Sequence, residues 1–339
     1  MSRRAEPGWR PGRRRLRDEE GRGGAAARRT IGRWLLSAIP LLFVVSALTF
    51  VLVSLTPGNA ARAIVGPDAT PAQYAYVRQQ LGLNHSLVYQ YWSWLSDALH
   101  GNLGNSLLSG TSVSQILLGR LPVTASIVVG TLVVAGVVGI GLGVASAVTR
   151  GVLARIVDSI SLLGLAIPNF WLGLLLISAF AVSLPLLPAT GYTGLSSSPV
   201  EWLRSLVLPV ATLSLGSSAV LAKLTRDAMS EELAKEYVLV LHAHGISAHS
   251  IVFKHALRNA SVQIVSVLGL VFIGLLSGSV LIESVFSLPG LGSMAVIATQ
   301  QHDLPVVQGI AVVFTVAVVV VNLVIELLYS WLDPRVQPS

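Results

Sequence analysis

The sequence contains no cysteine and carries little charge for its length. The absence of cysteine excludes disulfides, thiolate metal sites and cysteine nucleophiles. Only 12% of the 339 residues are charged and 53% are hydrophobic, whereas a soluble domain carries about 25% charged residues. So few charges cannot cover a globule of this size with a hydrated surface. We therefore expect most of the chain to lie in lipid.

Common sequence motifs for nucleotide binding and for hydrolytic catalysis are missing as well. The chain has no GxxxxGK[ST] run, so we do not expect it to bind ATP through a Walker loop. It has no GxSxG or HExxH run either, and we expect it to be no enzyme and to bind no cofactor or metal. A net charge of +7 would suggest nucleic acid for a soluble protein. Here the arginines gather in one tail and at helix ends, so membrane topology explains them better and we expect no nucleic-acid partner.

Residues 1–29 differ in composition from the rest of the chain. Arginines alternate there with glycine, proline and alanine, and almost nothing large is available to bury. We interpret this region as a disordered basic cytoplasmic tail. One function for it would be attraction to anionic lipid. We favour the simpler explanations that the tail only sets the topology, or that the start codon is assigned too early.

Apolar stretches of membrane-spanning length dominate the remaining sequence. A hydrocarbon core about 30 Å thick needs about 20 apolar helical residues, and unpaired backbone groups in lipid exclude structures other than helices here. We predict an all-α polytopic membrane protein with about six transmembrane helices, near 33–55, 122–148, 157–183, 204–222, 262–284 and 305–331.

The distribution of lysine and arginine predicts the orientation of these spans. Positive residues collect on the cytoplasmic side. A cytoplasmic N-terminus leaves only four of the 23 Lys and Arg residues outside, namely Arg62, Arg78, Arg120 and Arg204. Both termini are therefore predicted to be cytoplasmic.

Two further features of the membrane part stand out. Gly139 and Gly143 form a small-xxx-small pair in the second predicted span, which indicates close packing against another helix. The predicted outer loop 56–121 carries tyrosines and tryptophans among apolar residues, as an interfacial or partly membrane-dipping segment would.

The predicted inner loop 223–261 is the main hydrophilic cytoplasmic element after the tail. Helix-favouring residues begin it, Gly245 interrupts them, and Ser247 can cap a second helix that we expect to end near Asn259. A helix–glycine turn–helix of this kind makes a compact knob. Such a knob can transmit force from a soluble motor to the spans.

The loop resembles the cytoplasmic coupling loop of ABC-importer permeases of the dipeptide/oligopeptide/nickel family. The resemblance is carried by Glu236, Tyr237, Ala243, Gly245, Ile246, Ser247, His255, Arg258 and Asn259. Other strings match the family in order across residues 33–336, and they are similar to the first, B-type, permease. These include Arg120-Leu121-Pro122-x-Thr124, Ile167-Pro168-x-Phe170, Phe286-x-x-Pro289-Gly290-Leu291-Gly292 and Pro305-Val306-Val307-Gln308-Gly309.

The resemblance implies a type I ABC-importer transmembrane fold, with a permease domain over 30–336 and residues 223–261 as the coupling loop. It implies a place in the bacterial inner membrane, in contact with lipid, beside a homologous second permease subunit. It also implies two ABC ATPase subunits that carry the ATP and magnesium, and an extracytoplasmic peptide-binding protein. Peptides are the implied cargo, with nickel or another small solute as alternatives. A self-sufficient secondary transporter is disfavoured because we find no internal repeat and almost no charge at the span centres.

The coupling loop departs from the family pattern at several positions. The family usually has basic residues where Leu239, His242 and His244 stand, and alanine where Leu241 stands. The ATPase groove that receives the loop would then be less acidic. Histidines 242, 244, 249 and 255 do not share one helical face, so exposed loop histidines are favoured over a metal site.

Few polar residues could line a path through the membrane. An intramembrane carboxylate is a functional candidate by default, and we name Glu283, Asn169 and Asn322 as a candidate substrate path. His302 and Asp303, just outside the last span, could touch an external binding protein. A hydrated loop is the favoured interpretation of this pair.

Overall fold

The computed structural model describes residues 38–55, 60–66, 68–149, 155–156, 159–160, 164 and 166–332. The predicted basic tail 1–29 lies outside these residues. Helices joined by turns and loops make up the described residues, which contain no named strand. Five of the helices are long and apolar enough to cross a membrane: Ala38–Leu55, Val113–Val148, Pro199–Leu233, Ala248–Val285 and Leu304–Tyr329. The prediction of an all-α membrane protein is confirmed.

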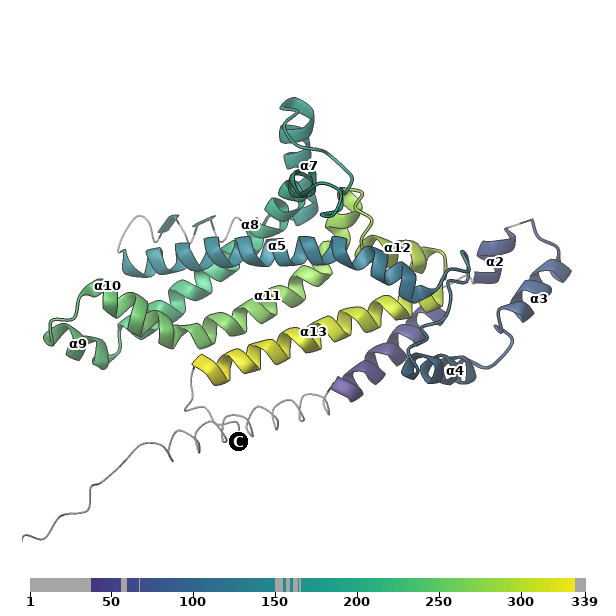
Figure 1. Ribbon diagram of the computed structural model, residues 1–339, viewed down its shortest axis with the longest axis horizontal. Coiled ribbons are helices and arrows are strands. Elements are labelled where there is room, and N and C mark those ends of the chain that lie inside the picture. Colours follow the sequence, from purple (N-terminus) through teal and green to yellow (C-terminus); the bar gives the residue numbers. More distant parts are fainter. Residues whose placement is uncertain are drawn as a thin grey trace, which may run out of the picture.

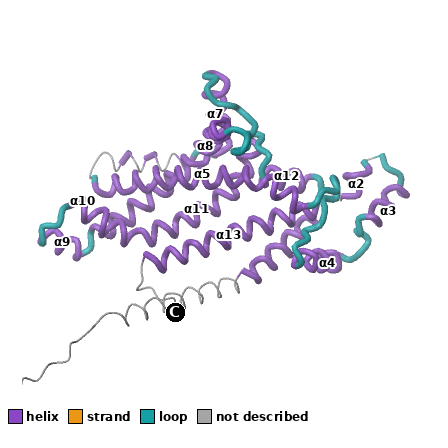
Figure 2. The backbone as a smooth tube through the Cα atoms, viewed as in Figure 1, coloured by secondary structure: helices purple, strands orange, loops and turns teal. Residues whose placement is uncertain are grey.

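Four long helices run alongside one another in an elongated bundle (Figure 1). They are α5 (Val113–Val148), α8 (Pro199–Leu233), α11 (Leu257–Val285) and α13 (Leu304–Leu332). The short helices α9 (Glu236–Ala243) and α10 (Ala248–Ser250) lie at one end of the bundle. At the other end lie α2 (Ala60–Val65), α3 (Pro71–Gln80) and α4 (Leu87–Leu99). Figure 2 shows that loops gather mainly at the ends and beside α7.

Two helices are longer than the spans predicted from hydropathy. Helix α5 begins at Val113, inside the predicted outer loop, and α8 continues to Leu233, inside the coupling loop. Hydropathy locates only the lipid-facing part of a helix. The helical hydrogen bonds continue through polar residues such as Arg120 and Asp227. Pro122 and Pro209 lie inside these helices without ending them.

The predicted span 157–183 lies partly outside the described residues. Its described part contains α7 (Asn169–Ile177) and the π-helical segment Ser178–Ser183, which together form a shorter apolar helix. Pro168 precedes α7, because proline cannot donate to an earlier turn but suits the first residues of a helix. A sixth complete span stays a prediction.

Glycine allows the close approach of α5 and α8. A Cβ on Gly139 would lie 2.9 Å from the carbonyl oxygen of Ser218, and one on Gly143 would lie 2.7 Å from that of Ala222. Backbone atoms cannot rotate away as a side chain can. The predicted small-xxx-small contact is confirmed, and its partner is α8. The opposite face of α5, with Val133 and Val137, is exposed and apolar.

Apolar side chains from α5, α8, α11 and the turn that follows α11 form the main core of the bundle. The fully buried members of this core are large, and they interlock where the three helices meet near the end that carries α12 (Leu291–Gln300). They include Ile127, Leu213, Ile282, Phe286 and Leu288.

The outer loop is helical and is anchored by one buried tyrosine. Thr70 and Gln73 form a capping box at the start of α3, and Ser86 caps α4. Tyr91 of α4 is buried, and its hydroxyl lies 3.0 Å from Ser46 Oγ on the Ala38–Leu55 helix. The ring of Tyr91 also packs edge-on against Phe50. The first spanning helix therefore holds the outer loop in place.

We predict that Gly143→Ala destabilises the protein by about 1–3 kcal/mol, the usual cost of overpacking a tight contact. The added methyl group would force α5 away from the backbone of α8. Gly141→Ala is the matched control, because a Cβ there meets nothing within 4 Å. It should be neutral or slightly stabilising through helix propensity. Thermal unfolding of both purified variants in detergent checks this, and equal melting temperatures would contradict it.

Candidate functional site

The coupling loop has a sharp turn at Gly245. Gly245 has a φ of 77°, in the left-handed region that glycine adopts without strain. Its N–H donates to the carbonyl of His242 over 3.0 Å, and the N–H of Ile246 donates to the carbonyl of Leu241 over 3.2 Å. This pair of bonds is a Schellman motif that ends α9. The predicted role of Gly245 as the turn residue is confirmed.

The second helix of the loop continues into the membrane. Ser247 accepts a hydrogen bond from Ser250 N at the start of α10, as predicted for its cap. The chain then runs through the π-helical segment Ile251–Ala256 directly into α11, which ends at Val285. The prediction that this helix ends near Asn259 is wrong, because no glycine or proline follows Gly245 to break it before the span. The knob is thus the extension of a spanning helix.

Three polar side chains connect α9 to the ends of both long helices. The hydroxyl of Tyr237 donates to Glu232 Oε2 at the end of α8, over 3.0 Å. Asn259 Nδ2 on α11 donates to the same hydroxyl over 3.2 Å. Burial raises the pKa of Tyr237, which keeps the hydroxyl protonated as the donor that Glu232 needs.

Glu232 is the part of this network that sequence reasoning missed as a site residue. A carboxylate at a helix C-terminus is unfavourable by itself. Lys235 forms an ion pair with Glu232, and that carboxylate raises the pKa of Lys235. The signal was therefore an acidic residue at a helix end, followed three residues later by a lysine and five residues later by a tyrosine.

The outer surface of α9 is apolar. Leu239 is 71% exposed and Val240 is 54% exposed, and Phe253 on the next helix is also exposed. Val238 is buried and fixes the other face of α9. The predicted loop residues Glu236, Ala243, Ser247 and Arg258 are also exposed, while Ile246 and His255 are half-buried.

Two of the four loop histidines bond to their own helix. Nδ1 of His242 lies 2.9 Å from the carbonyl oxygen of Val238, and Nδ1 of His244 lies 2.8 Å from that of Val240. Within the described ranges, no group of three His, Cys, Asp or Glu residues could hold a metal ion.

A buried carboxylate forms a clamp at the other end of the bundle. Glu283 of α11 is fully buried. Thr124 Oγ1 of α5 donates to Glu283 Oε1 over 2.6 Å, and Ser293 N of α12 donates to Oε2 over 2.8 Å. Thr124 Oγ1 in turn accepts from Leu291 N over 2.8 Å. Charge-assisted bonds of this kind join three helices at one point.

Two glycines let the chain wrap closely around this carboxylate. A Cβ on Gly290 would lie 2.3 Å from Glu283 Cδ, and a Cβ on Gly292 would lie 2.6 Å from Val280 Cα. A side chain at Gly292 would collide with the backbone of Val280, and a side chain at Gly290 would displace the Glu283 carboxyl group. Thr124, Gly290 and Gly292 all belong to strings that carry the family resemblance, yet sequence reasoning did not connect them to Glu283.

Asp303 is a second buried carboxylate, at the start of the last span. Ser106 Oγ donates to Asp303 Oδ2 over 2.5 Å, and Leu107 N donates to Oδ1 over 3.1 Å. The favoured interpretation of Asp303 as part of a hydrated loop is wrong, since its side chain is 1% exposed. It ties the end of the outer loop to the start of α13. His302 beside it adopts a left-handed backbone with a φ of 58°.

The three residues proposed for a substrate path lie on different helices. Asn169 lies beside Gly216 and Gly278, where α7 meets α8 and α11. Asn322 is half-buried on α13. Among the described residues no hydrogen bond joins either asparagine to Glu283, and their role in the path stays a prediction.

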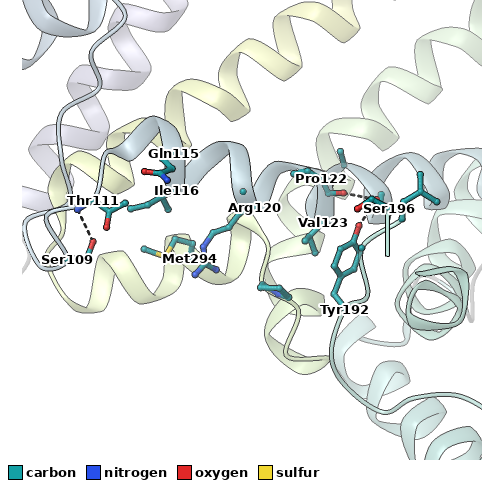
Figure 3. A pocket seen from close by; sticks show the side chains of 16 residues that line it. Ser109, Thr111, Gln115, Ile116, Arg120, Pro122, Val123, Tyr192, Ser196 and Met294 are labelled. Carbon is teal, nitrogen blue, oxygen red and sulfur yellow. Dashed lines mark hydrogen bonds between the residues drawn. The ribbon is translucent and has the colours of Figure 1, made fainter. Parts of the chain in front are cut away.

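A large open cavity lies beside the Glu283 clamp. Its volume is about 1250 Å³, and we call it the outer cavity because the predicted orientation places this end of the bundle outside. The first part of α5, the loop before α8 and the start of α12 line it, with a mostly apolar wall and several hydroxyl groups (Figure 3). The lining side chains include Gln115, Arg120, Val123, Ser126, Tyr192 and Met294.

Comparison with known protein families matches almost all of the chain. The model of the family described as the binding-protein-dependent transport system inner membrane component matches residues 139–338. The model of the N-terminal region of such membrane components matches residues 27–128.

Individual relatives are similar over nearly their whole length. A protein of Brucella suis named as a peptide transport system permease is 40% identical over 300 residues, which cover 88% of this chain and 96% of the relative. The glutathione transport system permease protein GsiC of Escherichia coli is 36% identical over 304 residues, which cover 89% and 97%.

A solved structure supports the fold. The inward-facing MetNI methionine ABC transporter superposes with a TM-score of 0.52 over 65% of this chain and 97% of the compared chain. The sequence identity is 18%, so the likeness shows the fold alone. The predicted ABC-importer transmembrane fold is confirmed, and the side on which the termini lie stays a prediction.

We predict that Glu283→Gln destabilises the protein by about 1–3 kcal/mol. Glutamine has only one acceptor oxygen, so its NH2 group would face either the N–H of Ser293 or the hydroxyl of Thr124. The first contact would place two donors together, and the Thr124 hydroxyl already accepts a hydrogen bond from Leu291 N. Glu201→Gln is the matched control, because Glu201 is an exposed carboxylate at the start of α8 whose ion pair contributes little. Thermal unfolding in detergent compares the two. A melting temperature of the Glu283 variant equal to that of the control would refute the clamp.

Proposed function

The chain belongs to the family of binding-protein-dependent transport system inner membrane components, and from this membership we propose that it is one permease subunit of an ATP-driven importer of peptides. It is a multi-pass protein of the bacterial inner membrane. Its task in such a system is to form part of the path, while partner subunits hydrolyse ATP.

The geometry of the coupling loop carries this proposal. Helix α9 lies between the ends of α8 and α11, and the Tyr237 hydroxyl bonds to both helices. A partner that displaces α9 therefore moves two long helices together. The short connections at Gly245 and Lys235 leave little slack for the displacement to be lost.

The exposed apolar patch on α9 indicates the chemistry of the ATPase surface. Leu239 offers apolar area where the resemblance implies a basic residue, and the exposed Val240 lies next to it in the chain. Burying this area against an apolar groove would be favourable, at about 25 cal/mol per Å². We propose that the two ATPase subunits present a groove that is apolar at this point.

A second permease subunit would complete the path. The outer cavity is open, and the exposed valine face of α5 offers an apolar surface for another helix or for lipid. One bundle of this size cannot enclose a channel wide enough for a peptide. The proposed assembly therefore has a homologous second permease, two ATPases and an extracytoplasmic peptide-binding protein.

The relatives support peptides as the cargo. One is named for peptide transport and another for the transport of glutathione, which is itself a short peptide. The mostly apolar lining of the outer cavity, with scattered hydroxyl groups, suits a ligand of variable side chains.

Reconstitution in liposomes tests the proposed function. We expect ATP-dependent uptake of labelled peptides when this chain is combined with the second permease, the ATPases and the binding protein. We expect no uptake by this chain alone. Peptide transport by the purified chain without companions would overturn the proposal, because the energy would then not come from a separate motor.

Paired variants in the same assay assign the motor contact. Leu239→Glu should lower ATPase binding and uptake, because it puts a charge into the apolar contact. Leu99→Glu is the control, since Leu99 is exposed to a similar degree but lies on α4 at the opposite end of the bundle. Equal ATPase binding by both variants would show that α9 is not the contact.

We predict that Gly245→Pro abolishes uptake while the protein is still inserted in the membrane. Proline requires a φ near −65° and lacks the N–H that donates to His242, so the turn cannot form. Gly245→Asn should keep most of the uptake, because asparagine tolerates the left-handed region. Uptake assays with matched amounts of membrane protein check both. Normal uptake by the proline variant would count against the coupling role.

A further inference from the structure

The outer cavity contains one unusual side chain. Arg120 is the only charged residue in the described lining, and it is half-buried. Figure 3 shows it beside Met294, with Thr111 and Gln115 on one side and Tyr192 on the other. Among the described residues, no hydrogen bond or ion pair holds its guanidinium group.

Another outer arginine shows the contrast. Arg204 forms an ion pair with Glu201 over 3.2 Å and donates to the carbonyl of Leu186 over 2.9 Å. Its charge is thus compensated by its own chain. Arg120 makes no such direct bonds among the described residues, and a half-buried guanidinium group whose donors are unpaired is costly.

The buried clamp does not supply the missing partner. Arg120 and Glu283 interact through space. Both oxygens of Glu283 already accept hydrogen bonds, from Thr124 and from Ser293 N, and its side chain has no exposed surface. The donor groups of Arg120 therefore remain available to a molecule in the cavity.

Guanidinium groups select one kind of ligand. Two of the five N–H donors of arginine can bind the two oxygens of a carboxylate in a bidentate geometry. The guanidinium group also keeps its positive charge, because it is not deprotonated in proteins. The described lining contains no acidic side chain that would hold an amino group. A volume of about 1250 Å³ exceeds the usual range of small-molecule pockets, about 300–1,000 Å³, and leaves room for a short peptide.

We propose that the outer cavity is a binding site for a carboxylate of the transported peptide, with Arg120 as the residue that binds it. Val123 and Met294 offer apolar contact beside it, and Gln115 offers an amide that can donate to the same ligand. The site orients the peptide with its negative group toward α5. This inference rests on the proposed import of peptides.

The test compares three peptides in the reconstituted importer. They are trialanine with a free C-terminus, trialanine amide, and Ala-Glu-Ala amide, which carries its carboxylate on a side chain. The variants are Arg120→Gln, Arg120→Lys and the control Arg204→Gln. Every variant uses the same binding protein, so any preference of that protein for one peptide cancels when the uptake ratios of two variants are compared. Each ratio is also independent of the amount of complex in the liposomes.

We expect the ratio of acid to amide uptake to fall roughly tenfold in Arg120→Gln, the size of a lost charge-assisted bond. The ratio for Arg120→Lys should lie between those of the wild type and Arg120→Gln. The ratio for Arg204→Gln should match that of the wild type. If the glutamate peptide behaves like the free acid, either carboxylate binds. If it behaves like the amide, the site is specific for the C-terminus.

Two outcomes would overturn the site while leaving peptide import intact. One is unchanged uptake of both the acid and the amide by Arg120→Gln. The other is an equal loss of acid and amide uptake, which would place Arg120 against a partner protein instead of the substrate. Failure of the wild-type complex to import any of the peptides would overturn the proposed function and this site with it.

Discussion

The requirement that backbone polar groups be paired inside lipid determines most of this structure. A helix satisfies this requirement within its own segment, so the chain becomes a set of long rods. Two of these rods, α8 and the helix ending at Val285, extend beyond their predicted spans into the coupling loop. The same hydrogen-bond ladder that makes the membrane crossing possible thus makes the loop a rigid part of the crossing helices.

Polar contacts occur mainly where the rods must be fixed to each other at their ends. Tyr237 connects α8, α9 and α11 at one end, and Glu283 connects α5, α11 and α12 at the other. Between them, α5 and α8 touch through Gly139 and Gly143 with hardly any side-chain layer. Helix α11 takes part in both polar contacts, so it is the element through which the two ends of the bundle are physically continuous.

Features set by local chemistry could be predicted from the sequence, and features set by distant partners could not. The left-handed turn at Gly245, the cap at Ser247 and the close glycine contact follow from residue types at fixed spacing. Helix ends were misplaced because hydropathy reports lipid contact and not the hydrogen-bond ladder. The surroundings of Glu283 and Asp303 escaped prediction, since their hydrogen-bonding partners Thr124 and Ser106 lie far away in the sequence.

The π-helical segment Ile251–Ala256 has a consequence for how this chain is compared with its relatives. A π turn accommodates one extra residue, which amounts to about 100° of angular phase. A helical wheel drawn with a constant 3.6-residue period across 248–285 therefore cannot be right on both sides of this segment. If it places the residues before the segment correctly, it places those after it on the wrong face of the helix. A relative with an uninterrupted α-helix would show a one-residue gap here in an alignment. Such a gap would mean that the following residues lie on different faces of the helix, and not that a loop is shorter.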